Sequence, residues 1–222
     1  MSLDISAIWD EAWAESLAEQ EQATKVPVSE WRSAGRKTKD KPHGEDLEFW
    51  KQAGLEQATA YAEWLERSGW KIATLGDEPA IEFEVRAEFG GVEVLGYADC
   101  MYETPDLILV DYKTGSRTPK SWFQLCLYAQ AIERMYGVRP VLGAYFMTRK
   151  GELSTPEPLD RYDDSFFDRM FHQLAQAREN GPFLPNLGDI CHTCDVAYAC
   201  YARGGAEAHR YDPDHPQFGG HK

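Results

Sequence analysis

Two polar elements that flank one apolar run place the strongest constraint on how this chain can fold. Gly96–Asp99 comes first, and Asp111–Gly115 follows the apolar run Leu107–Val110. A short apolar run bounded by turn residues predicts a buried β-strand. We expect Asp99 to end one strand and Asp111 to end the next, so that a hairpin brings the two carboxylates together.

Lys113 adds a positive charge to these two candidate carboxylates. It lies two residues after Asp111, and side chains at positions i and i+2 of a strand share one face of the sheet. Two carboxylates and an amine on one face can bind Mg²⁺ and position a water molecule for attack on a phosphodiester. Asp-x-Lys alone is a weak signal, because an aspartate at a strand end is commonly a surface residue. The prediction therefore depends on the surrounding elements.

The rest of the chain shows helical patterns before, between and after the strand patterns. The residue spacing predicts helices over residues 4–22, 45–68, 119–136 and 164–179, and strands over residues 81–85, 92–99, 106–113 and 141–147. This order predicts an α/β fold in which one mixed β-sheet is flanked by helices. We expect a single domain over residues 1–203, with a helical N-terminal region (1–70), a core (78–147) and a C-terminal helix and cysteine segment (164–203). The tail, residues 204–222, is rich in Gly, Pro and His and is expected to be disordered.

The charge distribution limits how this chain could bind nucleic acid. The net charge of −14 argues against non-specific binding by the whole surface. Residues 32–41 nevertheless contain five basic residues against one acid, and residues 111–150 contain seven basic residues against two acids. An acidic body could thus carry a basic cleft, although ordinary solvated faces explain either stretch equally well.

The composition also predicts the compartment. No apolar run approaches the roughly 20 residues of a membrane span. The first 18 residues predict an acidic amphipathic helix rather than a signal peptide, because no positive segment precedes an apolar one. We therefore expect a cytoplasmic protein without membrane contact.

Four features in order resemble one known family. A Gly-x-x-Asp element and an Asp-Tyr-Lys-Thr-Gly element end successive strands, and a strand with Glu82 and Glu84 precedes them. Gln124 and Tyr128 then fall on one face of the following helix, at positions i and i+4. Over residues 78–147 the chain resembles the PD-(D/E)XK nuclease superfamily in its RecB-like exonuclease branch. The resemblance implies a restriction-endonuclease-like mixed sheet flanked by helices.

The resemblance implies a metal-dependent exonuclease that hydrolyses phosphodiester bonds of linear or single-stranded DNA in recombination or repair. Asp99 and Asp111 would be the metal carboxylates, and the backbone carbonyl of Tyr112 would be a further ligand. Such hard oxygen ligands suit Mg²⁺ or Mn²⁺, and the metal lowers the pKa of a bound water. Lys113 would orient the water and stabilise charge on the phosphate.

The family pattern also suggests residues that would contact DNA. Gln124 and Tyr128 would line the DNA-facing side of the site, although a helix packed on a sheet often carries a tyrosine there. Arg117 and Lys120, which follow the Asp-x-Lys element, are further DNA-binding candidates.

Two further catalytic candidates lie upstream. The branch often has a histidine or an acid on the helix before the strands, and His43 fits this role, with Glu45 and Glu56 as alternatives. Glu82 would reach the edge of the site if its strand is oriented as in the family. Glu84 shares that face, so the choice between the two glutamates stays open.

Three of the five cysteines form a C-terminal group, Cys191-x-x-Cys194-x₅-Cys200. This spacing favours an iron–sulfur or zinc site, and the odd total argues against a disulfide scaffold. The group resembles the C-terminal cysteines of Cas4-like and AddB-like members, where an N-terminal cysteine completes a [4Fe–4S] cluster.

The first cysteine of that pattern is missing here. The cysteines outside the C-terminal group are Cys100 and Cys126, and both are expected in the core. Three alternatives stay open: a [4Fe–4S] cluster with a non-cysteine fourth ligand, Zn²⁺ held by three thiolates and a histidine such as His192, and free thiols.

The tryptophan-rich acidic start of the chain also resembles Cas4-family exonucleases of actinobacterial phages. This resemblance implies the host cytoplasm as the compartment, DNA as the partner, and a recombination protein or helicase as a further partner. Two alternatives remain: a catalytically silent DNA-binding or assembly protein on a nuclease fold, and an endonuclease of the same superfamily. The missing cysteine and the negative charge favour the silent protein, whereas the intact Asp99, Asp111 and Lys113 argue against it.

Overall fold

The computed structural model describes residues 3–32, 37–39, 42, 44–180 and 186–208. The chain divides into two compact units, of which the first contains residues 1–87 and 95–163 and the second contains residues 88–94 and 164–222. The catalytic candidate His43 lies outside the described residues, as do residues 209–222 of the expected tail.

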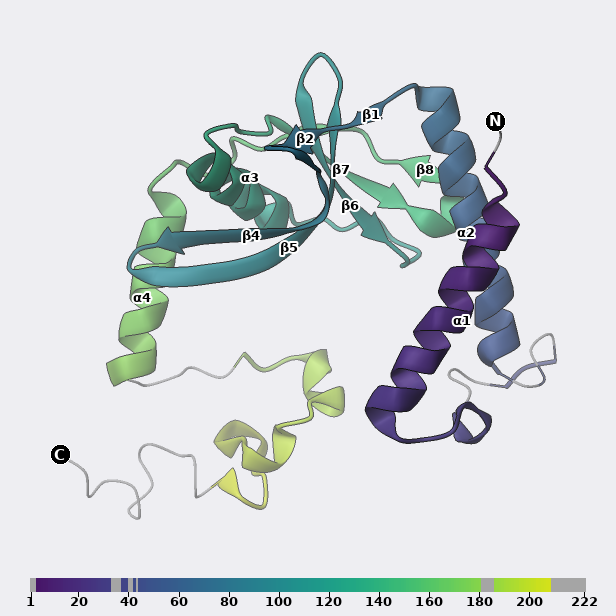
Figure 1. The fold of residues 1–222 in the computed structure, drawn as a ribbon. Helices are drawn as coiled ribbons and strands as arrows, with labels where there is room; N and C mark the ends of the chain where they lie inside the picture. Colours follow the sequence, from purple (N-terminus) through teal and green to yellow (C-terminus); the bar gives the residue numbers. More distant parts are fainter. Residues whose placement is uncertain (1–2, 33–36, 40–41, 43, 181–185, 209–222) are drawn as a thin grey trace. The chain divides into compact units, whose positions relative to one another are not determined.

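A seven-stranded mixed sheet forms the centre of the first unit (Figure 1). β5 and β6 pair antiparallel, and β6 and β7 pair parallel, which confirms the mixed sheet. The strand order is β1-β5-β6-β7-β8, with β4 also paired to β5 and β9 to β7. The strands are β1 (Lys71–Ile72), β4 (Ile81–Phe89), β5 (Val92–Glu103), β6 (Leu107–Lys113), β7 (Leu142–Met147), β8 (Glu152–Leu153) and β9 (Glu157–Pro158), and a separate pair consists of β2 (Thr74–Leu75) and β3 (Glu78–Pro79).

The expectation that Asp99 ends its strand is wrong. β5 continues to Glu103, and its last residues pair with β6 from Cys100, opposite Val110, to Glu103, opposite Leu107. The residues after Asp99 are apolar and fully buried, so both faces of the strand are covered there and the strand continues. Asp99 therefore lies inside a long strand, next to the pair that Cys100 forms with Val110 of β6.

The described residues contain four α-helices that flank the sheet or follow it in the chain, as the helical spacing predicts. Aspartates cap two of them: Asp4 accepts a hydrogen bond from the Ala7 backbone, and Asp46 accepts one from the Phe49 backbone. α3 begins later than predicted, because Pro119 belongs to the preceding loop and Trp122 is the N-cap. The helices are α1 (Ile5–Thr24), α2 (Leu47–Ser68), α3 (Phe123–Tyr136) and α4 (Phe166–Asn180).

Two of these helices bury opposite faces of the sheet. On one face, Trp64 of α2 joins a buried cluster with Cys100, Tyr102 and Phe146. On the other face, a Cβ at Gly143 of β7 would lie 3.2 Å from Leu125 of α3, so the helix approaches the strand closely. The prediction that Cys100 and Cys126 belong to the core is confirmed, since both are buried.

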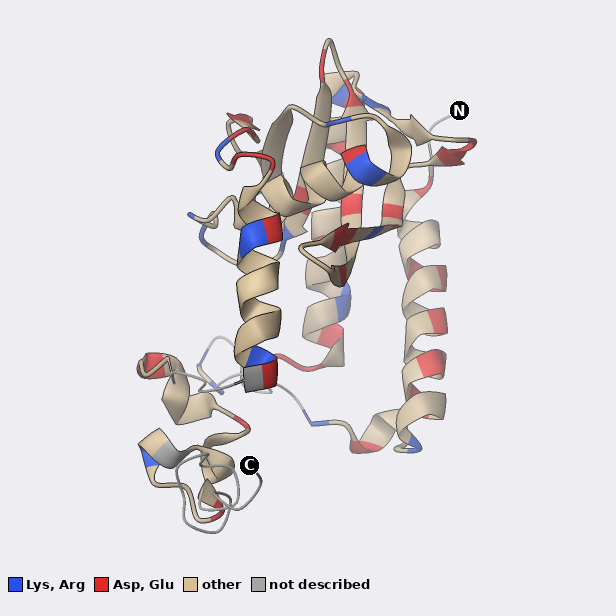
Figure 2. Ribbon diagram, turned by 90° about the vertical axis from the view of Figure 1, so that its left-hand side faces the viewer, with Lys and Arg blue, Asp and Glu red and all other residues tan. Residues whose placement is uncertain are grey.

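α1 differs from α2 and α3 in its burial. It is a helix as predicted, but none of its residues is fully buried, and Ile8 is 51% exposed. Acidic residues recur along its whole length (Figure 2). Among the described residues, no helix combines the length and the apolar character that crossing a membrane requires.

The second unit consists of the turn end of the β4–β5 hairpin, α4 and the cysteine segment. Phe89 packs against Phe167 and Phe171, with ring centroids 5.9 Å apart in both pairs. The backbone N–H of Gly90 donates a hydrogen bond to Asp168 at 2.8 Å. After α4 the chain forms the short 3₁₀ turns η3 (Asp189–Thr193), η4 (Ala197–Ala199) and η5 (Tyr201–Arg203).

Candidate active site

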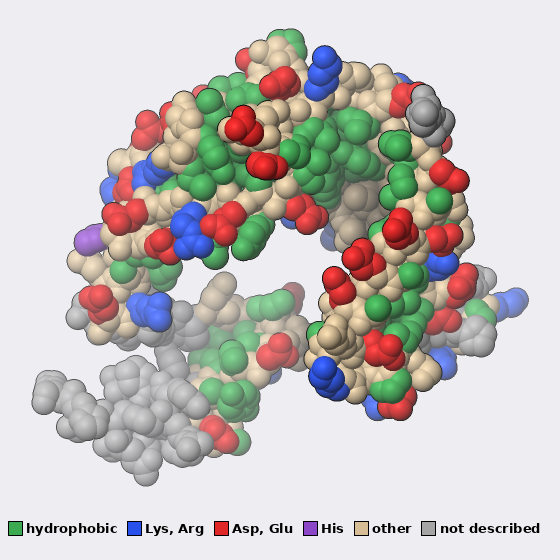
Figure 3. Space-filling model, in the orientation of Figure 1, with side chains coloured by type: hydrophobic (Ala, Val, Ile, Leu, Met, Phe, Trp, Pro, Cys, Tyr) green, Lys and Arg blue, Asp and Glu red, His purple; other side chains and the backbone are tan. Residues whose placement is uncertain are grey.

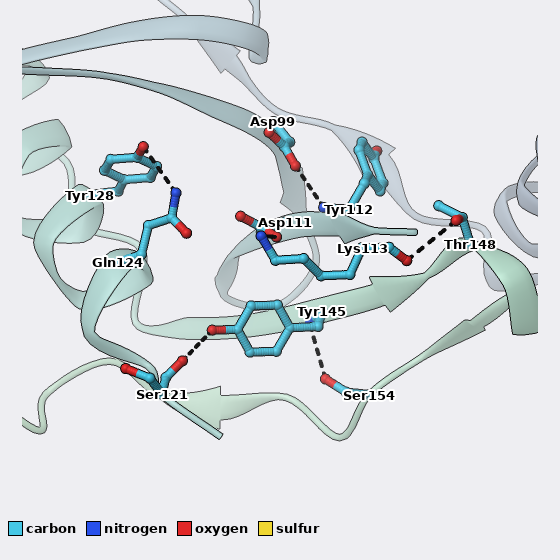
Figure 4. Close-up of polar contacts among 10 residues, drawn as sticks. All are labelled: Asp99, Asp111, Tyr112, Lys113, Ser121, Gln124, Tyr128, Tyr145, Thr148 and Ser154. Carbon is cyan, nitrogen blue, oxygen red and sulfur yellow. Dashed lines mark hydrogen bonds and ion pairs between the residues drawn. The ribbon is translucent and has the colours of Figure 1, made fainter. Parts of the chain in front are cut away.

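The hairpin of β5 and β6 brings Asp99 and Asp111 to the same end of the sheet (Figure 4). Asp111 is buried, with 5% of its surface exposed. Its Oδ2 atom lies 2.5 Å from Nζ of Lys113, which is consistent with the shared strand face predicted from their spacing. Lys113 keeps 32% of its side chain exposed, so its ammonium can reach both the carboxylate and a ligand from solvent.

Asp99 is tied to the backbone of β6. Its Oδ2 atom accepts a hydrogen bond from the backbone N–H of Tyr112 at 2.6 Å. This bond replaces a strand-to-strand hydrogen bond, so one carboxylate oxygen is fixed by the sheet. Among the described residues, the second oxygen of Asp99 has no hydrogen-bond partner.

Burial is the main influence on the protonation of Asp111. It raises the pKa of the Asp111 carboxyl above its ordinary value, the ion pair with Lys113 opposes this shift, and the charge of Asp99 adds to it. Oδ2 is a buried atom without a hydrogen bond of good geometry to any described residue, in spite of the nearby ammonium. A cation beside this buried oxygen would add positive charge to that of Lys113.

These residues fit a divalent cation. Mg²⁺ is usually held by one or two carboxylates, with water and substrate phosphate completing its coordination. In the part of the chain that the structure describes, no group of three or more His, Cys, Asp or Glu residues could hold a metal ion. The candidate set is thus two carboxylates, and Asp99 and Asp111 would hold the cation with the carbonyl of Tyr112 as a further oxygen ligand.

The side chain of Tyr112 points to the opposite face and is locked there. Its hydroxyl lies 2.7 Å from the hydroxyl of Tyr102 and 3.1 Å from that of Tyr61, and Tyr61 and Tyr102 are 2.6 Å apart. Burial raises the pKa of Tyr102 and of Tyr112 well above the ordinary value, so these two phenols stay neutral. This triangle of hydroxyls fixes the backbone that lies between Asp111 and Lys113.

Tyr145 is a site residue that the sequence patterns did not indicate. The parallel register of β6 and β7 places it opposite Asp111, and its ring centroid lies 6.0 Å from Nζ of Lys113. Its hydroxyl donates to the carbonyl of Ser121 at 2.5 Å, and its backbone N–H donates to Ser154 at 2.9 Å. Burial and the neighbouring Asp111 raise the pKa of Tyr145 to about 12.

Gln124 and Tyr128 project from α3 toward the face that carries Asp111 (Figure 4). Nε2 of Gln124 donates a hydrogen bond to the Tyr128 hydroxyl at 3.2 Å, so the i,i+4 pair is formed. Gly96 permits this arrangement, because a Cβ there would lie 2.7 Å from the Tyr128 ring. The glycine of the Gly-x-x-Asp element thus has a steric function.

The remaining candidates are not brought to the carboxylate pair. Arg117 and Lys120 are exposed in the loop between β6 and α3. Glu82 is exposed, has a positive φ of 44°, and makes no hydrogen bond or ion pair with Asp99, Asp111 or Lys113 among the described residues. The roles of these residues stay predictions.

The C-terminal cysteines do not form a metal site in the described part of the structure. All three are half-buried in the turns that follow α4, and none is in a disulfide. Cys191 Sγ accepts a weak hydrogen bond from the Gly188 backbone at 3.4 Å. Cys191, Cys194 and Cys200 are not gathered into one group of metal donors among the described residues, and the choice between an iron–sulfur cluster, zinc and free thiols stays a prediction.

The fold and the site together define a class of protein. A mixed sheet flanked by helices, with two aspartates and the lysine of an Asp-x-Lys strand at one sheet end, is the architecture of a restriction-endonuclease-like nuclease. The chain belongs to the PD-(D/E)XK nuclease superfamily, whose family model matches residues 4–201.

Phage proteins are among the relatives of this chain. It is 36% identical over 165 residues to the Gene 69 protein of Mycobacterium phage D29, and 31% identical over 183 residues to the Gene 69 protein of Mycobacterium phage L5. Each match covers 70% of this chain but 60% and 62% of the relatives, so the chain spans about three fifths of their length. The crystal structure of SSO0001 is similar at 17% identity with a TM-score of 0.34, covering 69% of this chain and 77% of that one, which is too low to support an argument.

Proposed function

We propose that this protein is a Mg²⁺- or Mn²⁺-dependent deoxyribonuclease of the RecB-like, Cas4-related branch that acts as an exonuclease on linear or single-stranded DNA. One observation carries the proposal. The buried Asp111 carboxylate lies 2.5 Å from the partly exposed Lys113 ammonium, beside a second carboxylate that is tied to the same strand. A buried carboxylate is costly unless positive charge compensates it, and a cation beside Lys113 would add such compensation.

The chemistry follows from the groups at the sheet end. A bound divalent cation would polarise the scissile phosphate and lower the pKa of a water molecule. Asp99 and Asp111 would hold that cation, and the hydrogen bonds among the tyrosine hydroxyls would keep the Tyr112 carbonyl in place as a further ligand. Lys113 has three donor hydrogens and shares only part of them with Asp111, so it can orient the water and stabilise negative charge on the phosphate.

DNA would be bound mainly through its phosphate backbone. Gln124 and Tyr128 line the side of the site toward α3, and Arg117 and Lys120 project from the exposed loop between them and Lys113. Because the chain carries a net charge of −14, these local cations have to act against an overall repulsion. Binding should therefore weaken steeply as the salt concentration rises.

The biological setting is also part of the proposal. The similarity to two mycobacteriophage proteins favours a phage origin, with the host cytoplasm as the compartment. An exonuclease in this setting would serve recombination or repair, with a recombination protein or a helicase as its partner. The cysteine segment has a structural role in the proposal, and visible absorption together with zinc analysis of anaerobically purified protein distinguishes iron–sulfur, zinc and free thiols.

Degradation of end-labelled linear DNA tests the function directly. The natural protein should shorten the DNA only with Mg²⁺ or Mn²⁺, and Lys113→Ala and Asp111→Ala should each reduce the rate by about 100-fold or more. Asp106→Ala and Lys71→Ala are matched controls, because both residues are exposed and lie at the other end of β5 and β6 from Asp99 and Asp111. A covalently closed circle that is cut would favour the endonuclease alternative. DNA binding without cutting by all five proteins would favour the catalytically silent one.

A further inference from the structure

A pocket with aromatic walls lies between α1, α2 and the end of β6, and the proposed chemistry does not use it. Its volume is about 590 Å³, and its lining is almost entirely apolar. Three tryptophans and two tyrosines line it: Trp9, Trp13, Trp50, Tyr61 and Tyr112.

Specific contacts hold the walls of this pocket in place. The indole N–H of Trp9 on α1 donates a hydrogen bond to the Lys51 carbonyl on α2 at 2.9 Å. The Trp9 ring lies directly over Gly54, where a Cβ would come within 2.2 Å of it. Trp13 continues the wall, with its ring centroid 5.7 Å from that of Trp9. The pocket is thus a built feature of the packing of α1 on α2.

The pocket and the candidate carboxylates share one strand. Asp111 and Lys113 point to one face of β6, whereas Tyr112 between them points to the other face and lines the pocket, as does Thr114 after them. The hydroxyl of Thr148 donates to Gln57 on α2 and lies 3.3 Å from the Lys113 carbonyl. The carboxylates and the pocket thus lie on opposite faces of one strand end, and a DNA strand that reaches both has to pass around the end of β6.

Positive charge adjoins the pocket on one side. A smaller hollow of about 340 Å³ shares Trp50, Gln57 and Thr148 with it and adds Arg149 and Lys150, with Glu56 as its one acidic residue. The Arg149 guanidinium lies 5.8 Å from the Trp50 ring centroid. The exposed side of α1 is acidic in contrast (Figure 3). An anion beside the pocket is therefore favoured at Arg149 and Lys150 and disfavoured along α1.

An apolar aromatic pocket next to two cations is complementary to a nucleotide. Aromatic rings stack on any nucleobase, because every base has a π-face, and basic side chains bind the phosphate. We propose that this pocket binds one unpaired nucleobase of the substrate strand, with its phosphate at Arg149 and Lys150. The inference rests on the proposed nuclease function and specifies its substrate as DNA with unpaired bases near the site.

Filling the pocket tests this inference without removing any contact. Ala58 on α2 lines the pocket, so Ala58→Leu should occupy part of the space that a base requires. Ala14→Leu is the matched control, because Ala14 is exposed on α1 and does not line the pocket. The probe is single-stranded oligothymidylate without divalent metal, and the readout is quenching of tryptophan fluorescence. We expect quenching by the natural protein and the control, and binding about tenfold weaker or more for Ala58→Leu.

Two further measurements keep the test decisive. If Ala58→Leu does not fold, Trp50→Leu removes one wall and should weaken binding by a similar factor. An oligonucleotide of abasic residues needs no variant: it should bind the natural protein about as weakly as oligothymidylate binds Ala58→Leu.

The outcomes separate the pocket from the nuclease. Equal binding of oligothymidylate by the natural protein and both pocket variants would overturn the inference that the pocket binds a base, even if linear DNA is still cut with metal. Equal binding of abasic and thymidine strands would overturn it as well. If the natural protein cuts no DNA but binds oligothymidylate, and Ala58→Leu loses this binding, the result would support base binding in the pocket and refute the proposed nuclease.

Discussion

Replacing Asp111 by asparagine should stabilise the metal-free protein while it abolishes cutting. Asparagine has the same shape but no charge, and the Asp111 carboxylate is buried with one oxygen that lacks a well-formed hydrogen bond. Without a metal ion, the folded protein has to keep this charge in a place where burial disfavours it. On the proposed function, the site would lower the stability of the metal-free protein in exchange for affinity for a cation.

The size of the effect follows from two opposing contributions. Burying a polar group without a satisfactory partner costs about 1–3 kcal/mol. The substitution also removes the ion pair with Lys113, but Lys113 is 32% exposed, so its ammonium regains water and the loss is about 0–1 kcal/mol. The expected net gain in the free energy of unfolding is about 1 kcal/mol, or roughly 2–4 °C in Tm for a protein of this size.

The gain should depend on pH in a defined direction. Because the pKa of Asp111 is raised in the folded protein, the folded state holds this proton more tightly than the unfolded chain does. Below the ordinary aspartate pKa of 3.8, the natural protein therefore carries no cost for burying an ionised Asp111 carboxylate. This cost develops as the pH rises through the raised pKa. The difference between Asp111→Asn and the natural protein should be largest at neutral pH and vanish toward acid pH.

Thermal unfolding followed by tryptophan fluorescence measures this difference in the relevant part of the molecule. All seven tryptophans belong to the first unit, so their signal reports the unit that carries the site. The melts are recorded with a chelator and then with Mg²⁺, which should raise the Tm of the natural protein but not that of Asp111→Asn. Asp106→Asn, at an exposed turn, is the matched control. A lower Tm for metal-free Asp111→Asn at neutral pH, or a difference that does not shrink in acid, would refute the reasoning.

Three further predictions concern other parts of the molecule. Gly96→Ala should displace the Tyr128 ring and weaken DNA binding severalfold in a gel-shift assay without metal, and unchanged affinity would show that Tyr128 does not contact DNA. Gly90→Ala should destabilise the second unit by about 2 kcal/mol or more, because Gly90 has a φ of +58° and a Cβ would lie 2.0 Å from the Asp168 carbonyl. Thermal unfolding followed by circular dichroism measures this loss, and an unchanged melting curve would contradict it. Alkylation of the native protein should modify Cys191, Cys194 and Cys200 before Cys100 and Cys126, because burial raises the pKa of the two core thiols. Mass spectrometry reads the order of modification, and simultaneous modification of all five cysteines would contradict the burial of the core pair.

The sequence was sufficient for the features that depend on local spacing. Alternation in residues 81–85 and the apolar run before Asp111 predicted strands that the structure contains as β4 and β6. The spacing of Asp111 and Lys113 predicted their shared face, because the two-residue period of a strand needs no tertiary information. The interpretation of Asp99 as a strand end failed, since the strand continues where its next residues become buried on both faces.

Features that depend on packing between distant segments were not predictable. The Tyr61 hydroxyl meets that of Tyr102, 41 residues later, because α2 packs on the sheet, and no local pattern marks these two residues as partners. Tyr145 reaches the site only through the parallel register of β6 and β7, which the intervening helix sets. The helical spacing of α1 predicted an apolar face but could not show that this face forms an open pocket instead of a closed core.

The division of the molecule into units also has a consequence for its synthesis on the ribosome. The turn end of the β4–β5 hairpin is translated long before α4, the helix against which it packs. Gly90 and its partner Asp168 are separated by 78 residues, which take about 4–16 s to translate at 5–20 residues per second. During that time the ring of Phe89 has no access to Phe167 or Phe171, so the nascent chain exposes an apolar strand end that a chaperone could recognise.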